Sequence, residues 1–483
     1  MRVKWLEKQL FGKKSERLDP DQPELFKEGS EMGKPEPPLD SEKASEREEE
    51  DVKRKQRKRR TKDELGLRNL PVIEKARLKP KEVTANPSGF KKIGERYHDE
   101  LDYVPGRMQW QRTVIEEFVS LTDDTQPPLR ETAPAPMIPG TMITASLAAD
   151  MIINKHCDHL PHYRQACRYF REQSVQISHK TINKWVHAAA SHLAPIAASI
   201  GQELRSSNLL QVDETPMDYL QPGCSCSFQG YIWVMRCPKS GATYYHWEAR
   251  RNNQALLNLL GYGAGNQEHG FKGVIQCDGY SCYESFRKAY DGIALATCMA
   301  HIRRKFLEDE GLILEPWVAY LLKAIKALYR IERRLRRTNA LPDQVKRTRL
   351  QYAQPILIKL KQLLLDRKTA FRPSSSGAKA VNYALSQWTQ LENYLKNGDL
   401  PIDNNGVENA IRPCKLGLKN YLFFGSLEAG VNNTVLYTLI ENCKAVGINV
   451  RDYLVYVIEA LHVEQPEDLT PAKIAQKWDE VAA

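Results

Sequence analysis

Three acidic residues have the types and positions that a metal-dependent site requires. Asp213 and Asp278 each follow a short apolar run that predicts a β-strand, and Glu408 lies close to the predicted start of a helix. Hard cations such as Mg²⁺ and Mn²⁺ prefer carboxylate oxygens as ligands. Strand ends in an open sheet are places where such ligands converge. The three residues therefore predict a site for divalent cations other than zinc.

The chemistry that such a site serves is cleavage or joining of phosphodiesters. At neutral pH this reaction needs an activated water or 3′-hydroxyl and a neutralised leaving oxygen, and two divalent ions about 4 Å apart supply both. The alternative is that the three carboxylates are ordinary surface residues, because the chain has 60 acidic side chains and such coincidences are common. The pattern alone leaves both interpretations open.

Residues 207–300 predict the first part of a mixed α/β domain. Short runs rich in aromatic and β-branched residues predict strands, and amphipathic runs between them predict helices. The expected order is three meandering strands, a helix, a strand, a helix and a strand, which is the order of a ribonuclease-H-like sheet. The predicted strands are 209–213, 230–235, 242–247, 273–278 and 293–297, and the predicted helices are 253–260 and 282–290.

Residues 301–400 predict an all-helical insertion into this domain. Apolar residues at helical spacing form two stripes that we expect to pack inward. The stripes are Tyr320, Leu321, Ile325, Leu328 and Ile331, and then Ile356, Leu360 and Leu363.

Residues 401–425 predict the second part of the domain, a helix that carries Glu408 and is capped by Asp403 or Asn404. Pro413 predicts a kink or an end of that helix. Residues 426–483 predict a C-terminal helical region. Gly447 predicts the end of one helix, Asn449 the N-cap of the next and Thr470-Pro471 the start of a short terminal helix.

Residues 141–206 predict helices, with a good N-cap at Ser178. The pattern is that of a helix-turn-helix that binds DNA: a helix, a short turn and a capped second helix. We expect Lys180, Asn183 and Lys184 to be exposed on the second helix. The alternative is an ordinary helical hairpin, which is commoner. The apolar stripes expected to pack inward are Leu147, Met151 and Ile152, and then Tyr163, Cys167 and Phe170.

The amino-terminal 140 residues predict two further segments. Residues 1–83 are a charged arm with too few apolar residues to offset the entropy of ordering, so we expect disorder. Its basic run, 53–60, is a solvated linker or, alternatively, an arm that binds phosphates. Residues 84–140 predict a small β-rich module with strands at 101–104 and 109–115.

Composition narrows the class of protein. The chain has 483 residues and a net charge of +10, which favours an anionic partner such as nucleic acid. It has no apolar stretch of the roughly 20 residues that cross a bilayer, so we expect a soluble, cytoplasmic protein without a membrane partner. Its 10 cysteines are scattered, and we expect reduced thiols. Zinc sites at Cys224, Cys226 and Cys237, or around His156–His162, have weak support from spacing.

Several motifs in order resemble the transposases of the insertion sequence 66 family, of the TnpC type. The resemblance runs from about Asp158 to Leu461, and weakly back to residues 101–105. The motifs that carry it are Val212-Asp-Glu-Thr-Pro216, Cys277-Asp-Gly-Tyr280, Cys298-Met-Ala-His-Ile-Arg-Arg-Lys-Phe306, Leu400-Pro-Ile-Asp-Asn-Asn-Gly-Val-Glu-Asn-Ala-Ile-Arg-Pro413 and Lys419-Asn-Tyr-Leu-Phe-Phe-Gly-Ser426.

The resemblance implies that Asp213, Asp278 and Glu408 are the catalytic carboxylates of a DDE transposase, which holds Mg²⁺ or Mn²⁺. It implies double-stranded DNA as the partner, both as terminal inverted repeats and as target, and a homodimer or higher oligomer on that DNA. Small accessory proteins encoded with this family are further candidate partners, and the bacterial nucleoid is the expected location. The basic residues expected at phosphates are His301, Arg303, Arg304, Lys305, Arg412, Lys415 and Lys419.

The sequence departs from the family pattern at three points. The zinc-binding cysteines expected before residue 101 are absent, since no cysteine occurs before Cys157, so we expect residues 84–140 to fold without zinc. The leucine zipper region looks truncated, because the chain begins almost at Gln9-Leu-Phe-Gly-Lys-Lys-Ser-Glu16. Asn409 replaces the usual arginine after Glu408.

Two alternatives to an active transposase therefore stay open: a degenerate transposase that only binds DNA, and a ribonuclease-H-like nuclease such as a resolvase.

Overall fold

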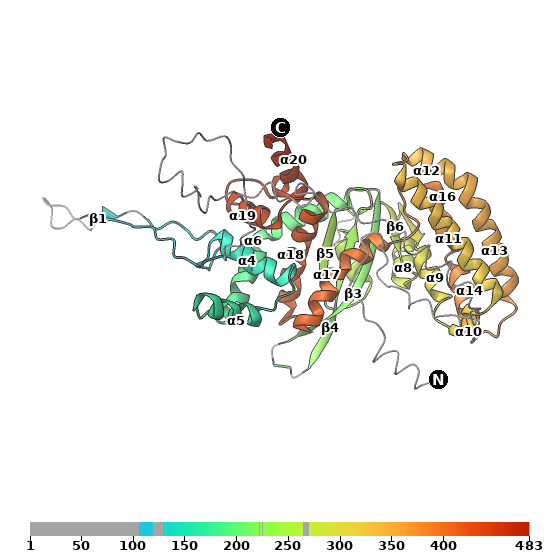
Figure 1. Cartoon of the computed structure of the whole chain (residues 1–483), viewed down its shortest axis with the longest axis horizontal. Helices are drawn as coiled ribbons and strands as arrows, with labels where there is room; N and C mark the ends of the chain where they lie inside the picture. The colour runs from blue at the N-terminus through green and yellow to red at the C-terminus, as the bar shows by residue number, and fades with distance from the viewer. Residues whose placement is uncertain are drawn as a thin grey trace, which may run out of the picture. The chain divides into compact units, whose positions relative to one another are not determined.

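A computed structural model describes residues 106–118, 129–130, 132–221, 223–224, 226–263 and 270–482 (Figure 1). The chain divides into two compact units, and nearly all described residues belong to the larger one, whose described part begins at Gln111. The predicted charged arm, residues 1–83, and the predicted strand at 101–104 lie outside the described residues.

Residues 109–115, predicted as a strand, form none. Trp110 is 84% exposed and Val114 is 75% exposed, so neither packs against a core. The chain pairs only at a two-residue ribbon, where β1 (Glu117–Phe118) lies antiparallel to β2 (Leu129–Arg130). Strand-type residues stabilise a strand through packing against neighbours, and here that packing is missing. The strand predicted at 109–115 is therefore wrong, and much of the predicted β-rich module, residues 84–140, lies outside the described residues.

Helices α4, α5 and α6 form the predicted helical region. Their bounds are Ala145–His156, His162–Gln173 and His179–Arg205. Helix α5 packs against both of the others, and Met151 and Ile152 of α4 are buried as predicted. The cap at Ser178 is confirmed, because its hydroxyl accepts a hydrogen bond from the Thr181 N–H at 3.0 Å.

The apolar stripe predicted to pack inward on α5 is wrong: Tyr163, Cys167 and Phe170 are exposed. The face that packs inward carries Gln165 and Tyr169 instead. Tyr169 donates to the carboxylate of Asp150 on α4 at 3.0 Å, and Gln165 donates to the Met151 carbonyl at 3.2 Å. These polar bonds, rather than apolar burial alone, set the orientation of α5.

A five-stranded sheet follows, with the order β5-β4-β3-β6-β7. The three strands β3, β4 and β5 are antiparallel neighbours, whereas β6 pairs parallel to β3 and β7 pairs parallel to β6. The predicted mixed α/β class is confirmed. The strands are β3 (Leu209–Leu220), β4 (Ser227–Arg236), β5 (Thr243–Glu248), β6 (Gly273–Cys277) and β7 (Ile293–Thr297).

Helices cover both faces of this sheet. On one face α17 (Asn405–Tyr421) and α18 (Leu427–Val446) pack against β3, β4 and β5, with Ile232 and Val234 in the shared core (Figure 1). On the other face α7 (Asn253–Leu259) packs against β4 and α8 (Ser281–Ala289) against β7. Trp233, which alternates with Ile232 and Val234, accordingly meets Tyr283 of α8.

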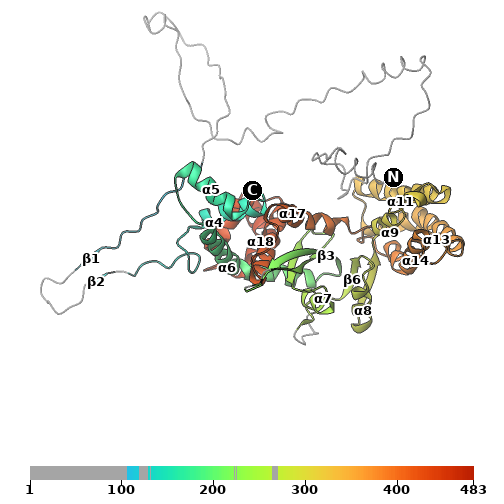
Figure 2. The same cartoon turned by 90° about the horizontal axis from the view of Figure 1, so that it is seen from below.

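The predicted helical insertion lies between β7 and α17, and it packs at the β7 edge of the sheet (Figure 2). Leu321, Ile325 and Leu328 are buried as predicted, whereas Tyr320 is 51% exposed. Its elements are α9 (Met299–Lys305), α10 (Glu310–Ile313), α11 (Pro316–Arg337), α12 (Pro342–Thr348), the π-helix η4 (Arg349–Ala353), α13 (Gln354–Lys368), α14 (Ser376–Ser386), α15 (Trp388–Leu391) and α16 (Asn393–Lys396).

The helix boundaries predicted for the C-terminal region are confirmed. Gly447 ends α18 with a φ of 79°, in the left-handed region that glycine adopts without strain. Asn449 then caps α19 (Val450–Ala460), and Pro471 begins α20 (Pro471–Ala482) after the 3-10 helix η5 (Pro466–Leu469). Within the described residues, no helix has the length and apolar character needed to cross a membrane.

Candidate active site

Asp213 lies on β3, and Asp278 directly follows the last residue of the neighbouring parallel strand β6. Strands β3 and β6 pair Leu209 with Val274, and the next pairs keep the same offset of 65 in residue number (274 − 209). Asp213 and Asp278 keep the same offset, because 278 − 213 is also 65, and both lie just beyond the last paired residues Gln211 and Gln276. The parallel pairing therefore leads the two chain segments with these aspartates to the same end of β3 and β6.

One detail of the prediction for Asp213 is wrong. The strand does not end there: β3 continues to Leu220, and Asp213 pairs with Val234 of β4. Its pairing with β6 has ended by that point, since β6 stops at Cys277. Asp213 thus lies where β3 separates from one neighbour while the other still holds it, which keeps its backbone rigid.

Two buried glutamines attach these strands to the segment that precedes Glu408. The Gln211 carboxamide donates to the Gln276 side chain at 2.8 Å and to the Asp403 carbonyl at 3.0 Å. Gln276 in turn donates to the Pro401 carbonyl at 2.8 Å. Both glutamines are at most 1% exposed, so water does not compete for these bonds. The backbone of residues 401–403 is therefore fixed against β3 and β6.

Glu408 lies in the first turn of α17, a helix that packs against β3 and β4. Of the two caps predicted, Asp403 makes the bond: its carboxylate accepts the Asn405 N–H at 3.2 Å, whereas the Asn404 side chain makes no cap hydrogen bond. The helix does not end at Pro413 but continues to Tyr421. Glu408 is thereby held over the same end of the sheet as the two aspartates.

The charges of the three carboxylates act on one another. Burial raises the pKa of Asp213 well above its usual range, and the carboxylates of Glu214, Glu408 and Asp278 raise it further. Burial also raises the pKa of Glu408; Arg304 opposes that shift, and the charge of Asp278 adds to it. The three charges therefore act on one another, but among the described residues the group whose potential ligand atoms all lie within 4.8 Å is Cys298, His301 and Glu408, and it contains neither aspartate.

The donor set fits a divalent cation. Glu408 is 6% exposed, and its Oε1 atom has no hydrogen-bond partner among the described residues. A buried carboxylate beside other carboxylates is costly unless a cation neutralises it. Asp213, Asp278 and Glu408 carry oxygen ligands only, which suit Mg²⁺ or Mn²⁺ better than softer metals.

Two of the predicted basic residues face Glu408. His301 Nδ1 lies 3.7 Å from Oε1, and Arg304 Nη2 lies 3.6 Å from Oε2. Both come from α9, which directly follows β7. Burial, with the positive charge of Arg304 and then of Lys305, lowers the pKa of His301 to about 4, although Asp278 opposes the shift. The imidazole is therefore neutral at pH 7.

The predicted stripe on α17 is present because the helix runs through Pro413. Glu408, Arg412, Lys415 and Lys419 follow the i, i+4, i+7, i+11 spacing of one helix face. Lys415 is half-buried, and Asp213 acts on its charge, so it borders the carboxylate cluster. Arg412 is half-buried and Lys419 is exposed farther along the helix.

The other two basic residues of α9 point elsewhere. Lys305 forms an ion pair with Glu308 at 2.9 Å and lies 6.0 Å from the centre of the Tyr383 ring. Arg303 is half-buried, and its charge acts on Tyr329 of the insertion. These two side chains therefore border the insertion rather than the three carboxylates.

A second donor set shares Glu408. Among the described residues, Cys298, His301 and Glu408 offer ligand atoms that all lie within 4.8 Å of one another. Cys298 is fully buried, its sulfur accepts the Asn404 N–H at 3.3 Å, and burial keeps its thiol protonated by raising its pKa. A protonated thiol is a poor ligand.

The predicted recognition residues lie on the N-terminal part of α6. Lys180, Asn183 and Lys184 are all exposed, whereas Ile182 and Val186 between and beyond them are buried. This alternation leaves one polar face of α6 open to solvent, as a helix that contacts DNA requires.

The weaker zinc candidates gain no support. All 10 cysteines are free thiols, and in the part of the chain that the structure describes no zinc-like cluster includes Cys224, Cys226 or Cys237. His156 is buried and bonds to the Ile152 carbonyl and to Asn433. It is therefore part of the core.

Sequence reasoning missed several residues at this site. Arg251 binds the Glu214 carboxylate, with Nε at 2.6 Å from Oε1, and stacks 3.8 Å from the centre of the Tyr280 ring. The two glutamines were also missed, although a signal exists: both strands carry a glutamine two residues before the aspartate, in an otherwise apolar run. A polar residue at the same position in two buried strands indicates a shared bond.

Comparisons with known proteins identify related chains. The family described as "Transposase IS66 family" matches residues 140–432, and the one described as "Transposase C of IS166 homeodomain" matches residues 1–74. Uncharacterized protein y4jD of Sinorhizobium fredii is 29% identical over 398 residues, which cover 79% of this chain and 75% of that protein. Uncharacterized protein y4qI of the same organism is 29% identical over 412 residues, 82% of this chain and 72% of that protein.

Proposed function

The chain belongs to the IS66 family of transposases, and from this premise we propose that it is a DNA transposase of the DDE type whose site is Asp213, Asp278 and Glu408. It binds the ends of a mobile element, cleaves the DNA there and joins the freed 3′-hydroxyl ends to target DNA. The observation that supports this proposal best is the shared register of the neighbouring strands β3 and β6, which leads to Asp213 and Asp278, together with the effect of the Asp278 and Glu408 charges on Asp213.

The sheet supports a ribonuclease-H-like fold for the catalytic domain. Three antiparallel strands are followed by two parallel ones in the order β5-β4-β3-β6-β7. Asp213 lies on the first strand of the domain and Asp278 directly follows the fourth, and these two strands are neighbours in the sheet. The helical insertion lies between Asp278 and Glu408 along the chain, and the charge of Asp278 still acts on Glu408.

Bound by Asp213, Asp278 and Glu408, two divalent cations would activate a water or 3′-hydroxyl and neutralise the leaving oxygen. The protein's own groups prepare the surroundings. Arg304 keeps a positive charge beside Glu408, where it attracts the phosphate of the DNA strand. The neutral His301 beside it can hydrogen-bond to a phosphate without repelling the cations.

DNA recognition rests on two groups of residues. The exposed face of α6, with Lys180, Asn183 and Lys184, suits the ends of the element. The basic face of α17, with Arg412, Lys415 and Lys419, suits the backbone of DNA that leads to the carboxylates. We propose that a homodimer or higher oligomer brings two such ends together.

The test begins with the DNA that flanks the coding region. Short inverted repeats on either side identify the substrate, and labelled fragments with these ends are incubated with the full chain in Mg²⁺ or Mn²⁺. We expect nicks at the element ends and products joined to a second DNA, and Ca²⁺ should support binding better than cutting. Equal cleavage in excess chelator contradicts the mechanism. Nicks without any joined product favour a nuclease, and binding without nicks favours a degenerate transposase.

A further inference from the structure

Three chemically different donors meet at Glu408. Cys298 directly follows β7, His301 lies three residues later on α9, and Glu408 lies on α17. Their ligand atoms, one sulfur, one nitrogen and one oxygen, all lie within 4.8 Å of one another, and His301 Nδ1 is 3.7 Å from Glu408 Oε1. Thiolate, imidazole and carboxylate are the ligands of zinc in proteins, and sites with three protein ligands keep a fourth position for water.

Two of these donor atoms are buried without a hydrogen bond. Glu408 Oε1 and His301 Nδ1 make none among the described residues. The 3.7 Å between them is too long for a hydrogen bond. Buried polar atoms are rarely left without a partner, and Glu408 is only 6% exposed. A cation bound between the two atoms would satisfy both.

The backbone of Asn404 joins Cys298 to Glu408. The Asn404 N–H donates to Cys298 Sγ at 3.3 Å, and the Asn404 carbonyl accepts the Glu408 N–H at 3.3 Å. The hydrogen bond to sulfur also favours the thiolate form, because it stabilises the charge that forms when the thiol loses its proton. One buried residue therefore fixes the distance between two of the three donors.

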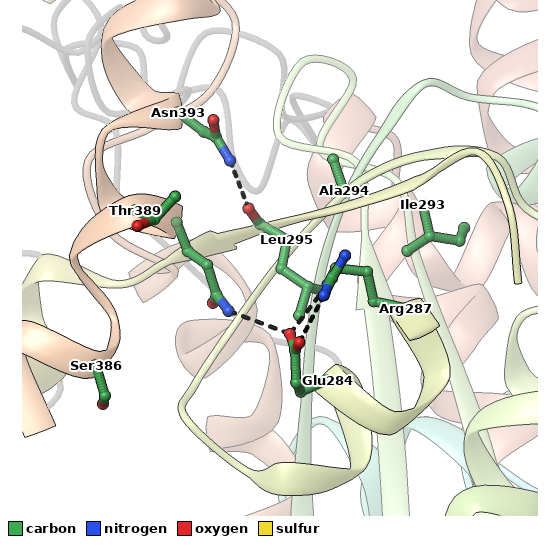
Figure 3. Close-up of a pocket in the computed structure, with 9 residues that line it drawn as sticks. Glu284, Arg287, Ile293, Ala294, Leu295, Ser386, Thr389 and Asn393 are labelled. Atoms are coloured by element: carbon green, nitrogen blue, oxygen red, sulfur yellow. Dashed lines mark hydrogen bonds and ion pairs between the residues drawn. The ribbon is translucent and has the colours of Figure 1, made fainter. Parts of the chain in front are cut away.

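Strand β7, which leads to Cys298, is fixed on both sides of that residue. Before Cys298, Asn393 of α16 donates to the Leu295 carbonyl of β7 at 2.9 Å (Figure 3). After it, the Met299 N–H donates to the Ile402 carbonyl at 3.0 Å. The backbone that carries the sulfur is thus held in place before any metal binds, which lowers the cost of ordering the site.

This donor set favours a cation softer than Mg²⁺. A metal that coordinates a thiol displaces its proton, which passes to the solvent, whereas Mg²⁺ keeps oxygen ligands. The thiolate and the Glu408 carboxylate together balance the two charges of Zn²⁺. Arg304 lies 3.6 Å from the other Glu408 oxygen, Oε2, which leaves Oε1 for the metal. The side chain of His301 is 19% exposed, so a cation has a way in from that side.

We propose that Cys298, His301 and Glu408 form a site for a thiol-binding divalent cation such as Zn²⁺, and that zinc bound there inhibits strand cleavage by withdrawing Glu408 from the Mg²⁺ site. The inhibition rests on the proposed function, because it takes Glu408 as a ligand of the catalytic cations. The binding of zinc does not, because it depends only on the three donors.

Binding is tested with Co²⁺, a spectroscopic substitute for Zn²⁺, on the full chain after treatment with chelator. A thiolate bound to Co²⁺ gives a charge-transfer band in the near ultraviolet, and addition of Zn²⁺ removes it. Cys298→Ser removes the sulfur, and His301→Gln removes the nitrogen at a partly exposed position. Cys443→Ser is the matched control for a fully buried thiol, and Cys226→Ser controls for an exposed one.

We expect the band in the wild type and in both controls, and its loss in Cys298→Ser. The affinity for Zn²⁺ should fall roughly 100-fold or more in Cys298→Ser and in His301→Gln, since loss of even an outer partner of a metal costs about 10–100-fold. If Cys298→Ser does not fold, His301→Gln still tests the site. A wild-type affinity for Zn²⁺ in either folded variant overturns it.

Inhibition is tested by cleavage of end-DNA in Mg²⁺ with increasing Zn²⁺, relative to the rate of each variant in Mg²⁺ alone. The half-inhibiting concentration of Zn²⁺ should rise roughly 100-fold in Cys298→Ser, and in the wild type it should rise with Mg²⁺, because the two sites share Glu408. Inhibition that is unchanged in Cys298→Ser means that zinc acts elsewhere and overturns the inhibitory role. A wild-type chain that shows the Co²⁺ band but never cleaves DNA in Mg²⁺ contradicts the proposed function and supports the zinc site.

Discussion

Gly406 lies directly against the side chain of Gln211. A Cβ atom at position 406 would lie 2.5 Å from Oε1 of Gln211 and 2.6 Å from Nη1 of Arg236, distances that real side chains do not tolerate. This contact lets the first turn of α17 approach the sheet closely, and Glu408 follows two residues later. The glycine therefore sets how deep the third carboxylate sits.

Gly406→Ala should lower stability by about 1–3 kcal/mol, the usual cost of overpacking. The sign is informative, because an alanine in place of glycine in an ordinary helix stabilises it by about 1 kcal/mol. Urea unfolding measures the change. Gly425→Ala is the control, since a Cβ atom there meets nothing within 4 Å. A Gly406→Ala variant as stable as the wild type would mean that α17 lies farther from the sheet.

Asp278→Asn should separate chemistry from binding. It removes one charge from the carboxylate cluster, and we expect cleavage of end-DNA to fall by more than about 100-fold, since even outer partners of a metal contribute about 10–100-fold. Affinity for the ends should persist in a gel shift, because the α6 face is untouched. Asp291→Asn, an exposed site in the next turn, is the control. Normal cutting by Asp278→Asn removes Asp278 from the site.

Lys184→Ala should do the reverse. Loss of a phosphate contact weakens binding to all sequences and reduces the slope of log K against log salt by about 0.9. Cleavage should be normal once the DNA concentration is saturating, because Lys184 is proposed to bind DNA and takes no part in the chemistry at the carboxylates. Binding titrations at several salt concentrations measure both effects, with Lys473→Ala on α20 for comparison. An unchanged salt slope would argue against α6 as the DNA-contacting helix.

The loss of folding stability at low pH should involve Asp150, whose carboxylate links α4 to α5 and α19. Burial raises the pKa of Asp150, but hydrogen bonds from Arg451 and Tyr169 and the charge of Arg168 outweigh it and bring the pKa below its usual value. The folded pKa is thus lower than the unfolded one, about 3.9. This group therefore stabilises the fold above about pH 4, and the contribution is lost as the pH falls through the folded pKa.

Asp150→Asn should accordingly destabilise the protein at pH 7, by about 2 kcal/mol for charged hydrogen bonds. The difference from the wild type should shrink below about pH 4. Urea unfolding at pH 7, 5 and 3 tests the dependence, with the exposed Asp158→Asn as control. A difference that stays constant over this range would show that the carboxylate charge contributes nothing.

The sequence alone determined the elements that depend on local signals. The strand at 293–297 is confirmed to the residue, and the caps at Ser178 and Asn449 and the stop at Gly447 are confirmed as well. These features depend on hydrogen bonds and backbone preferences within a few residues, so the local sequence specifies them. The same holds for the positions of the two aspartates along the chain, because each follows an apolar run that predicts a strand.

Only the tertiary structure decided which surfaces meet. The stripe on α5 turned outward because Asp150, from another helix, binds Tyr169. Residues 109–115 formed no strand because, within the described part of the chain, no partner strand covers Trp110 and Val114. The hydrogen bond from Gln211 to the Asp403 carbonyl likewise joins residues far apart along the chain. Such contacts depend on the packing of whole elements, and no local pattern encodes their partners.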